Sequence, residues 1–134
     1  MTAMTVALVD TSVWVALEKD RLINRDLMPE VSRVSVVTLA ELHAGVLAAP
    51  NAIIQTERLR TLERAQAIEP LPIDAAVARE WALLRYEIAR AGRRANINDL
   101  WIGATARANG LPVVTQDDDF AILAELGLLD VVTV

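Results

Sequence analysis

The sequence predicts an α/β fold in which helices cover both faces of a central parallel sheet. Short valine-rich apolar runs alternate with longer segments in which apolar residues recur at helical spacing. Strands that alternate with helices in this way favour a doubly wound sheet with right-handed crossovers. Because the 134 residues contain no linker or repeat, we expect one domain, residues 1–134, with three layers, α/β/α, around four to five strands.

The amino-terminal part of the chain is expected to supply two strands. Residues 5–9, TVALV, predict a buried strand that ends at Asp10. A helix should follow from Thr11 or Ser12, since both residue types cap helices well. Residues 33–38, RVSVVT, predict a second short strand that runs into the next helix.

The middle of the chain is expected to be mainly helical. The helix after the second strand carries Glu41, and a charged helix should occupy residues 51–66. Residues 67–73, AIEPLPI, predict a strand only at an edge of the sheet, because their prolines cannot donate ladder hydrogen bonds. A helix over 75–91 is the clearest element, with Asp74 as its N-cap. Its apolar stripe consists of Val77, Trp81, Leu84 and Ile88.

The carboxy-terminal part predicts two helices, each followed by a strand. A helix should begin at Asn98 and end before Gly110. Pro112 then leads into a strand over 113–115, and the last helix should start at about Phe120. The chain closes with a strand over 130–134, DVVTV.

The composition excludes several classes of protein. There is no cysteine, which excludes a disulfide framework and thiolate metal sites. No apolar run is long enough to span a bilayer, so we expect a cytoplasmic protein without a membrane role. The net charge of −5 argues against binding nucleic acid by overall charge. The Arg93-Arg94 pair either binds phosphate or belongs to a solvated helix face, and the sequence leaves both interpretations open.

Four acidic spots, far apart in sequence, fall where a parallel sheet would bring them together. Strand ends and helix starts meet at one rim of such a sheet, where open α/β folds bind ligands. Each acid alone has a structural explanation, as a turn residue, a cap or a solvated side chain. Gathered at one rim they would repel one another strongly, so the set predicts a site for a hard cation such as Mg²⁺ or Mn²⁺. The acids are Asp10, Glu41, Asp99 and the run Asp117, Asp118, Asp119.

Other chemistries that use a strand rim fit the sequence less well. A nucleotide-hydrolysing P-loop is absent, and the lone His43 cannot build a zinc site or a Ser-His-Asp triad. A receiver-like signalling domain would need a lysine near the site, and Lys19 lies in the wrong place. A phosphatase of the haloacid dehalogenase type would carry DxD after the first strand, where this chain has DTS.

Four segments, in order along the chain, resemble the PIN-domain family and specifically the VapC toxins of bacterial toxin–antitoxin pairs. They are VDTSVWVAL, SVVTLAEL, INDLWIGATA and VVTQDDDF. The resemblance implies a PIN-like domain that acts as an Mg²⁺- or Mn²⁺-dependent endoribonuclease and is neutralised by a cognate VapB-like antitoxin. It leaves as alternatives a PIN nuclease of RNA processing and a non-catalytic module that only binds a partner.

The resemblance also implies roles for particular residues. The expected catalytic acids are Asp10, Glu41, Asp99 and Asp117. The expected metal ligands are Asp10, Asp99, Asp117 and Asp119, although the register within the run of three aspartates stays open. Polar residues expected to order the site are Thr11, Ser12, Asn98 and Thr115. With RNA as the substrate, the candidate RNA-binding residues are Arg93 and Arg94.

Two further interactions are expected from the same reasoning. An antitoxin segment should dock near the amino-terminal helices, over a groove formed by Trp14, Val15, Leu22 and Ile23. An arginine or lysine of that segment would then reach the acids and displace the metal. The apolar stripe of the 75–91 helix is expected to pack against a second copy of the domain in a homodimer.

Overall fold

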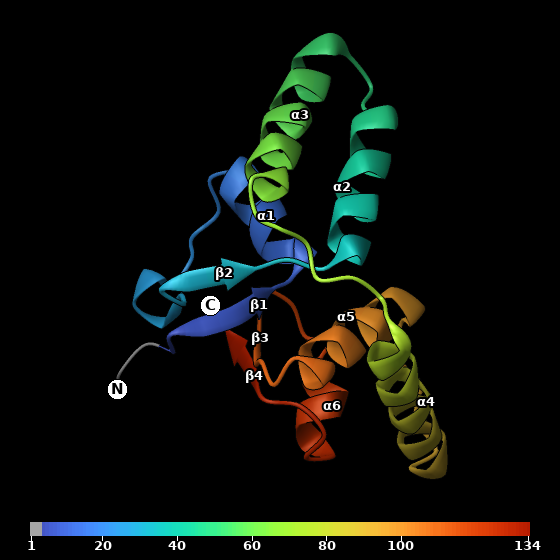
Figure 1. Ribbon diagram of the computed structural model, residues 1–134. Helices are drawn as coiled ribbons and strands as arrows, with labels where there is room; N and C mark the ends of the chain where they lie inside the picture. The colour runs from blue at the N-terminus through green and yellow to red at the C-terminus, as the bar shows by residue number, and fades with distance from the viewer. Residues whose placement is uncertain (1–3) are drawn as a thin grey trace.

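A computed structural model describes residues 4–134 as a three-layer α/β/α domain (Figure 1). Its sheet has four parallel strands within these residues, in the order β2-β1-β3-β4. The strands are β1 (Val6–Val9), β2 (Val31–Arg33), β3 (Val113–Thr115) and β4 (Val131–Thr133). The α-helices are α1 (Thr11–Glu18), α2 (Val36–Leu47), α3 (Ala52–Gln66), α4 (Ala75–Arg90), α5 (Ile97–Ala108) and α6 (Ala121–Glu125), with a 3₁₀ turn, η1 (Arg25–Leu27). The predicted fold class is confirmed.

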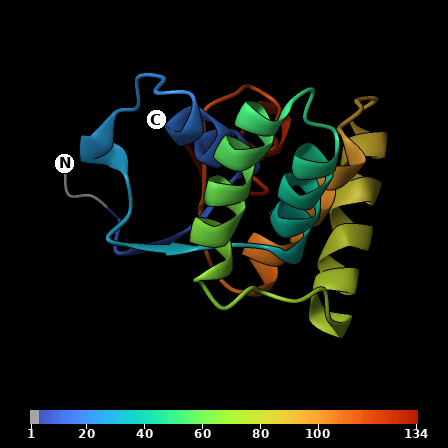
Figure 2. The same cartoon turned by 90° about the horizontal axis from the view of Figure 1, so that it is seen from above.

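Alternating strand residues supply the two halves of the hydrophobic core. Leu8 and Val113 face α4, α5 and α6, whereas Ala7, Val9 and Val114 face α1, α2 and α3. The buried strand residues are almost fully removed from solvent, as strands covered on both faces require. Figures 1 and 2 show the resulting layers, with the α2–α3 hairpin on one side of the sheet and α4 and α5 on the other.

Several helix boundaries follow the signals in the sequence. Asp74 caps α4 as predicted, accepting a hydrogen bond from the backbone N–H of Val77 at 3.0 Å. Gly92 and Gly110 follow α4 and α5 with positive φ, the conformation in which glycine ends helices. Helix α5 begins at Ile97, one residue earlier than predicted, because Asn96 supplies the cap.

Two strand predictions were wrong in extent. The second strand ends at Arg33, and Val36 to Thr38 form the first turn of α2. Ser35 explains the difference, since its hydroxyl accepts from the N–H of Thr38 and starts the helix despite the β-branched residues that follow. Residues 67–73 form no strand, and only an isolated bridge joins Leu71 to Ser35. The flanking prolines prevent a longer ladder.

Aromatic side chains pack α4 against α5, and Gly103 lets α5 lie close to α6 and α4. Trp81 stacks on Trp101 with ring centroids 4.8 Å apart, and the Arg85 guanidinium lies 5.2 Å from the Trp81 ring centre. Gly103 lets α5 lie close to its neighbours, because a Cβ at this position would be 3.0 Å from a methyl carbon of Leu123. This packing fixes the start of α5 relative to the sheet. None of the helices in the described part of the chain is long and apolar enough to cross a membrane.

Candidate active site

The carboxyl ends of the two central strands bring together residues more than a hundred positions apart. Asp10 directly follows β1, and Thr115 is the last residue of β3, the strand that pairs with β1 in parallel. Helix α1 starts at once after Asp10, so Thr11 and Ser12 lie at the same rim. The chain runs from β1 to β2 on one side and reaches β3 and β4 on the other, which makes this rim the switch point of the sheet.

An acidic cavity of about 280 Å³ opens at this rim. It is lined by Asp10, Thr11, Ser12, Val15, Arg21, Glu41, Asn96, Asp99, Asp117 and Asp119. The structure therefore brings together all four predicted catalytic acids and also Asp119. Asp118 does not line the acidic cavity. Whether these acids bind metal stays a prediction.

Asp10 is the most buried acid of the cavity, with 3% of its surface exposed. Its Oδ2 atom accepts hydrogen bonds from the Ser12 hydroxyl at 2.6 Å, the Thr115 hydroxyl at 3.1 Å and the Ser12 backbone N–H at 3.3 Å. The Ser12 hydroxyl oxygen in turn accepts from the backbone N–H of Gln116 at 3.0 Å. The carboxylate is thus fixed from the start of α1 and from the end of β3, and the described hydrogen bonds all reach the same oxygen.

Glu41 reaches the cavity from the second turn of α2. Its Oε1 atom accepts from the Thr11 hydroxyl at 2.8 Å, and its Oε2 atom accepts from the Asn98 side-chain amide at 3.5 Å. Thr11 also contacts the Thr38 hydroxyl at 3.0 Å, which links α1 to the start of α2. Asn98 therefore supports Glu41 without lining the cavity itself.

A tight turn after β3 presents alternate aspartates to the cavity. Asp117 Oδ1 accepts from the backbone N–H of Asp119 at 3.1 Å, and the backbone N–H of Asp117 donates to the Thr115 hydroxyl at 3.2 Å. In this turn Asp117 and Asp119 line the cavity and Asp118 does not, although Asp118 and Asp119 are both exposed. Short polar side chains that bond to the backbone two residues away commonly stabilise such turns.

Burial and repulsion between carboxylates raise the pKa values of two acids in the cavity. The pKa of Asp99 is raised from 3.8 to about 7, first by burial and then by repulsion from four other carboxylates. In decreasing order of effect these are Asp10, Asp119, Asp117 and Glu41. Burial also raises the pKa of Asp10, and the nearby Asp117 adds to the shift, although the hydrogen bonds from Ser12 and Thr115 oppose it. None of the ion pairs found among residues 4–134 includes an acid of the cavity.

The donor set suits a hard divalent cation. Carboxylate oxygens surround the cavity, and Mg²⁺ and Mn²⁺ prefer oxygen ligands together with retained waters. Within residues 4–134, no three acidic or histidine side chains already lie close enough together to coordinate one metal ion. Like charges turn apart when no cation lies between them, so small rotations of these side chains would accompany binding.

The sequence and fold were compared with known proteins. A model of the PIN domain matches residues 7–126. The chain belongs to the PIN-domain family. It is 47% identical to Ribonuclease VapC5 of Mycobacterium tuberculosis over 133 residues, which covers 99% of this chain and 98% of the relative. It is 43% identical to Ribonuclease VapC4 of the same organism over 125 residues, covering 93% of this chain and 96% of that protein.

A solved structure agrees with this assignment. The crystal structure of VapBC-5 from Mycobacterium tuberculosis, a member of the VapBC family of toxin-antitoxin systems, contains a chain that matches with a TM-score of 0.87 and 46% identity. The match covers 97% of this chain and 98% of the other. The recognised family and the PIN-like fold are therefore confirmed.

Two residues of the PIN-domain cavity were missed by the sequence reasoning. Asn96 caps α5, accepting from the backbone N–H groups of Asn98 and Asp99, and it lines the acidic cavity. The sequence did contain a signal for it, because an asparagine three residues before an acid is a common helix start. Arg21 is the one basic residue that lines the acidic cavity, and no motif pointed to it.

The predicted RNA-binding pair lies outside the acidic cavity. Arg93 forms an exposed ion pair with Glu125 at 3.2 Å, and Arg94 is exposed. Both residues line a separate depression with Ala95, whose neighbour Asn96 belongs to the acidic cavity. Their role in binding RNA stays a prediction. His43 is exposed and contacts Gln66 on α3, and it does not line the acidic cavity.

Proposed function

We propose that this PIN domain is a VapC-type endoribonuclease that depends on Mg²⁺ or Mn²⁺ and hydrolyses RNA phosphodiester bonds. The observation that carries the proposal is the convergence of five carboxylates at the switch point of the sheet, where burial and then repulsion from the other four raise the pKa of Asp99. Relatives that match almost the whole chain are named ribonucleases, which supports the same activity.

The side chains divide the work by position. Asp10, Asp99 and Asp117 would hold the cation, with Asp119 beside them at the open side of the cavity. A bound Mg²⁺ or Mn²⁺ lowers the pKa of a coordinated water and neutralises charge on the phosphate oxygens. Glu41, held by Thr11, would orient the attacking water and accept its proton.

The hydrogen-bond network explains why the site would work without large rearrangement. Ser12 and Thr115 fix Asp10 from two different elements, so its free oxygen points in one direction. Because attack by water does not use the ribose 2′-hydroxyl, the products are expected to carry 5′-phosphate and 3′-hydroxyl ends.

The decisive experiment tests cleavage and its dependence on metal together. Purified protein should cut RNA in Mg²⁺ or Mn²⁺, stop in EDTA and stay inactive in Ca²⁺, whose flexible coordination positions water poorly. Asp10→Asn should abolish cleavage, whereas Asp130→Asn, an exposed acid at the other end of the strands, should not. Undiminished cleavage in EDTA would refute the metal-dependent mechanism. No cleavage with any of the metals would indicate that the protein only binds a partner.

We also propose a cognate VapB-like antitoxin as the protein partner. A solved structure that this chain resembles is described as VapBC, a toxin–antitoxin family, and an antitoxin arginine or lysine could enter the acidic cavity. The prediction that Trp14, Val15, Leu22 and Ile23 form the docking groove is wrong in part. Trp14 is buried in the core, whereas Leu22 is almost fully exposed beyond the end of α1. Val15 does line the cavity and remains available to a partner.

A homodimer remains part of the proposal, but it would not use the surface expected from the sequence. Val77, Leu84 and Ile88 are buried within the domain itself, so most of the apolar stripe of α4 is already covered. The large exposed apolar residues of α4 are Leu83 and Tyr86, and a second copy that packs on α4 would contact these.

A further inference from the structure

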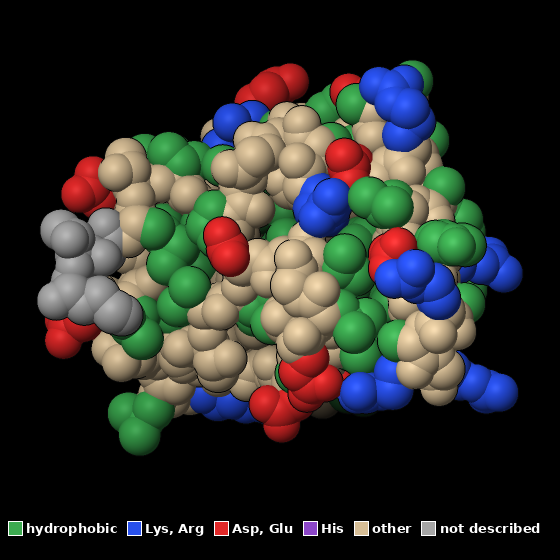
Figure 3. Space-filling model, turned by 90° about the horizontal axis from the view of Figure 1, so that it is seen from below, with side chains coloured by type: hydrophobic (Ala, Val, Ile, Leu, Met, Phe, Trp, Pro, Cys, Tyr) green, Lys and Arg blue, Asp and Glu red, His purple; other side chains and the backbone are tan. Residues whose placement is uncertain are grey.

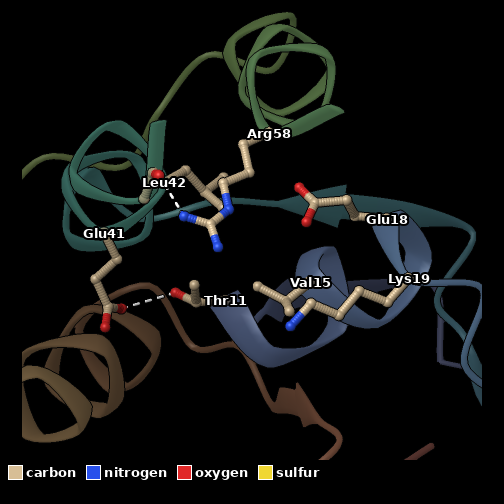
Figure 4. A pocket seen from close by; sticks show the side chains of 8 residues that line it. Thr11, Val15, Glu18, Lys19, Glu41, Leu42 and Arg58 are labelled. Carbon is tan, nitrogen blue, oxygen red and sulfur yellow. Dashed lines mark hydrogen bonds between the residues drawn. The ribbon is translucent and has the colours of Figure 1, made fainter. Parts of the chain in front are cut away.

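A second cavity, of about 260 Å³, adjoins the acidic cavity between α1, α2 and α3 (Figure 4). The two cavities share Thr11, Val15 and Glu41 as lining residues, so they lie side by side. The second cavity differs in chemistry from the first, because it also contains the basic residues Lys19 and Arg58. We refer to it below as the basic cavity.

Arg58 is held in place by the end of α2. Its Nη1 atom donates to the carbonyl oxygen of Gly45 at 2.7 Å, and its side chain lies across α2 where Gly45 has none. A guanidinium carries five N–H donors, so most of them remain after this bond. Figure 4 shows the group directed from α3 toward Thr11 and Val15, on the floor of the cavity.

Lys19 approaches the same space from the opposite side. It directly follows α1, and in Figure 4 its side chain runs back along the helix so that the ammonium group lies beside Val15. Neither Lys19 nor Arg58 belongs to the ion pairs described for residues 4–134. Glu18 also lines the cavity, but it forms no ion pair with either of them in this part of the chain. Two cations from different elements thus face one space, which Glu18 and Glu41 also line, and neither cation is paired with these carboxylates in the described ion pairs.

An acidic RNA-cutting site needs such cations beside it. Five carboxylates repel the phosphates of an approaching strand, and the protein as a whole carries −5. On the face shown in Figure 3, basic side chains are interspersed with acidic ones and form no broad positive surface. Attraction by the protein can come from local cations close to the acids. Arg21 lines the acidic cavity itself, and Arg58 in the adjoining cavity can bind a phosphate with two parallel hydrogen bonds.

We propose that the RNA strand runs from the acidic cavity into the basic cavity, and that a phosphodiester group next to the one being cut binds between Lys19 and Arg58. The inference rests on the proposed ribonuclease function. It assigns a positioning role to Lys19 and Arg58, since they would hold the strand in register without touching the reacting atoms. It also gives Glu18 an opposing role, because its carboxylate would repel the same phosphate.

Binding of RNA without cleavage tests the proposal. The probe is a fluorescein-labelled single-stranded RNA of mixed sequence, and its anisotropy is followed in Ca²⁺ over a series of salt concentrations. Lys19→Gln and Arg58→Gln should each weaken binding about three- to tenfold and lower the slope of log affinity against log salt by about one. Arg60→Gln is the matched control, because Arg60 is exposed on α3 and lines a different depression. Glu18→Gln should tighten binding.

The outcomes separate the possible failures. If wild-type protein neither binds nor cuts RNA, the proposed function itself fails. If wild-type protein does both, but Lys19→Gln and Arg58→Gln bind as Arg60→Gln does, only the phosphate site is refuted. If Lys19→Gln and Arg58→Gln bind RNA normally but no longer bind a co-expressed antitoxin, the basic cavity binds an acidic protein segment instead of RNA. Lys19→Gln keeps the test valid even if Arg58→Gln, which frees the Gly45 carbonyl, unfolds the protein.

Discussion

Replacing Asp99 by asparagine removes a negative charge from the acidic cavity with almost no change in shape. Burial and repulsion from the other acids raise the pKa of Asp99 to about 7 in the folded, metal-free protein, whereas its ordinary value is 3.8. Between these two values the folded state binds a proton that the unfolded state does not. The wild-type protein should therefore lose stability as the pH rises through this interval, and the variant should not.

The size of the effect follows from the shift. Moving a pKa from 3.8 to about 7 corresponds to about 4 kcal/mol at about 1.36 kcal/mol per pH unit. Asp99 is only half-buried, so solvent screening reduces the stability effect to about 1–2 kcal/mol. At about pH 8 in EDTA, Asp99→Asn should be more stable than wild type by this amount, or roughly 3–10 °C in Tm. At about pH 4 the two proteins should melt together.

Thermal melts in EDTA and in Mg²⁺ provide the assay. Mg²⁺ should stabilise wild type by binding the folded state, and it should stabilise Asp99→Asn much less. The Tm advantage of Asp99→Asn over wild type should therefore shrink or change sign in Mg²⁺. Asp130→Asn, which removes a carboxylate outside the acidic cavity, should follow wild type throughout. If Asp99→Asn melts below wild type in EDTA at both pH values, Asp99 stabilises α5 instead of being strained by its neighbours, and the electrostatic reasoning is refuted.

Three further changes test other parts of the structure. Ser12→Ala removes the 2.6 Å hydrogen bond to Asp10, so the pKa of Asp10 should rise further, and titration with Mg²⁺ followed by activity should show weaker binding, most clearly at acidic pH. Gly103→Val adds methyl groups where leucine side chains already fill the space, and urea unfolding should show a loss of about 1–3 kcal/mol. Arg93→Ala combined with Arg94→Ala should weaken RNA binding and flatten its salt dependence, whereas unchanged binding would return the pair to a solvated face.

Local signals in the sequence accounted for much of the fold. Asp74 and Gly92 marked the ends of α4, because an acid that accepts a backbone N–H and a glycine with positive φ act independently of distant residues. The buried strands β1 and β3 were clear from their unbroken apolar runs. The second strand was predicted over 33–38, but it lies at Val31–Arg33, since valine favours strands on average while the Ser35 cap decides the start of α2.

The acidic part of the site was more predictable than its basic part. Strand ends and helix starts must meet at one rim of a parallel sheet, so the positions of the carboxylates followed from topology alone. Arg21 and Arg58 could not be found in this way. A long side chain reaches a cavity only along a path set by its neighbours, and the path of Arg58 depends on the missing side chain of Gly45 and on its free carbonyl oxygen.

The pairing of β1 with β3 has a consequence for the timing of biosynthesis. The Thr115 hydroxyl bonds to Asp10 across 105 positions, and β3 is the partner that brings Asp117 and Asp119 to the rim. During translation β1 is made before β2, and both are made before β3 and the aspartates that follow it. The acidic cavity can therefore form only after the chain has been made through Asp119.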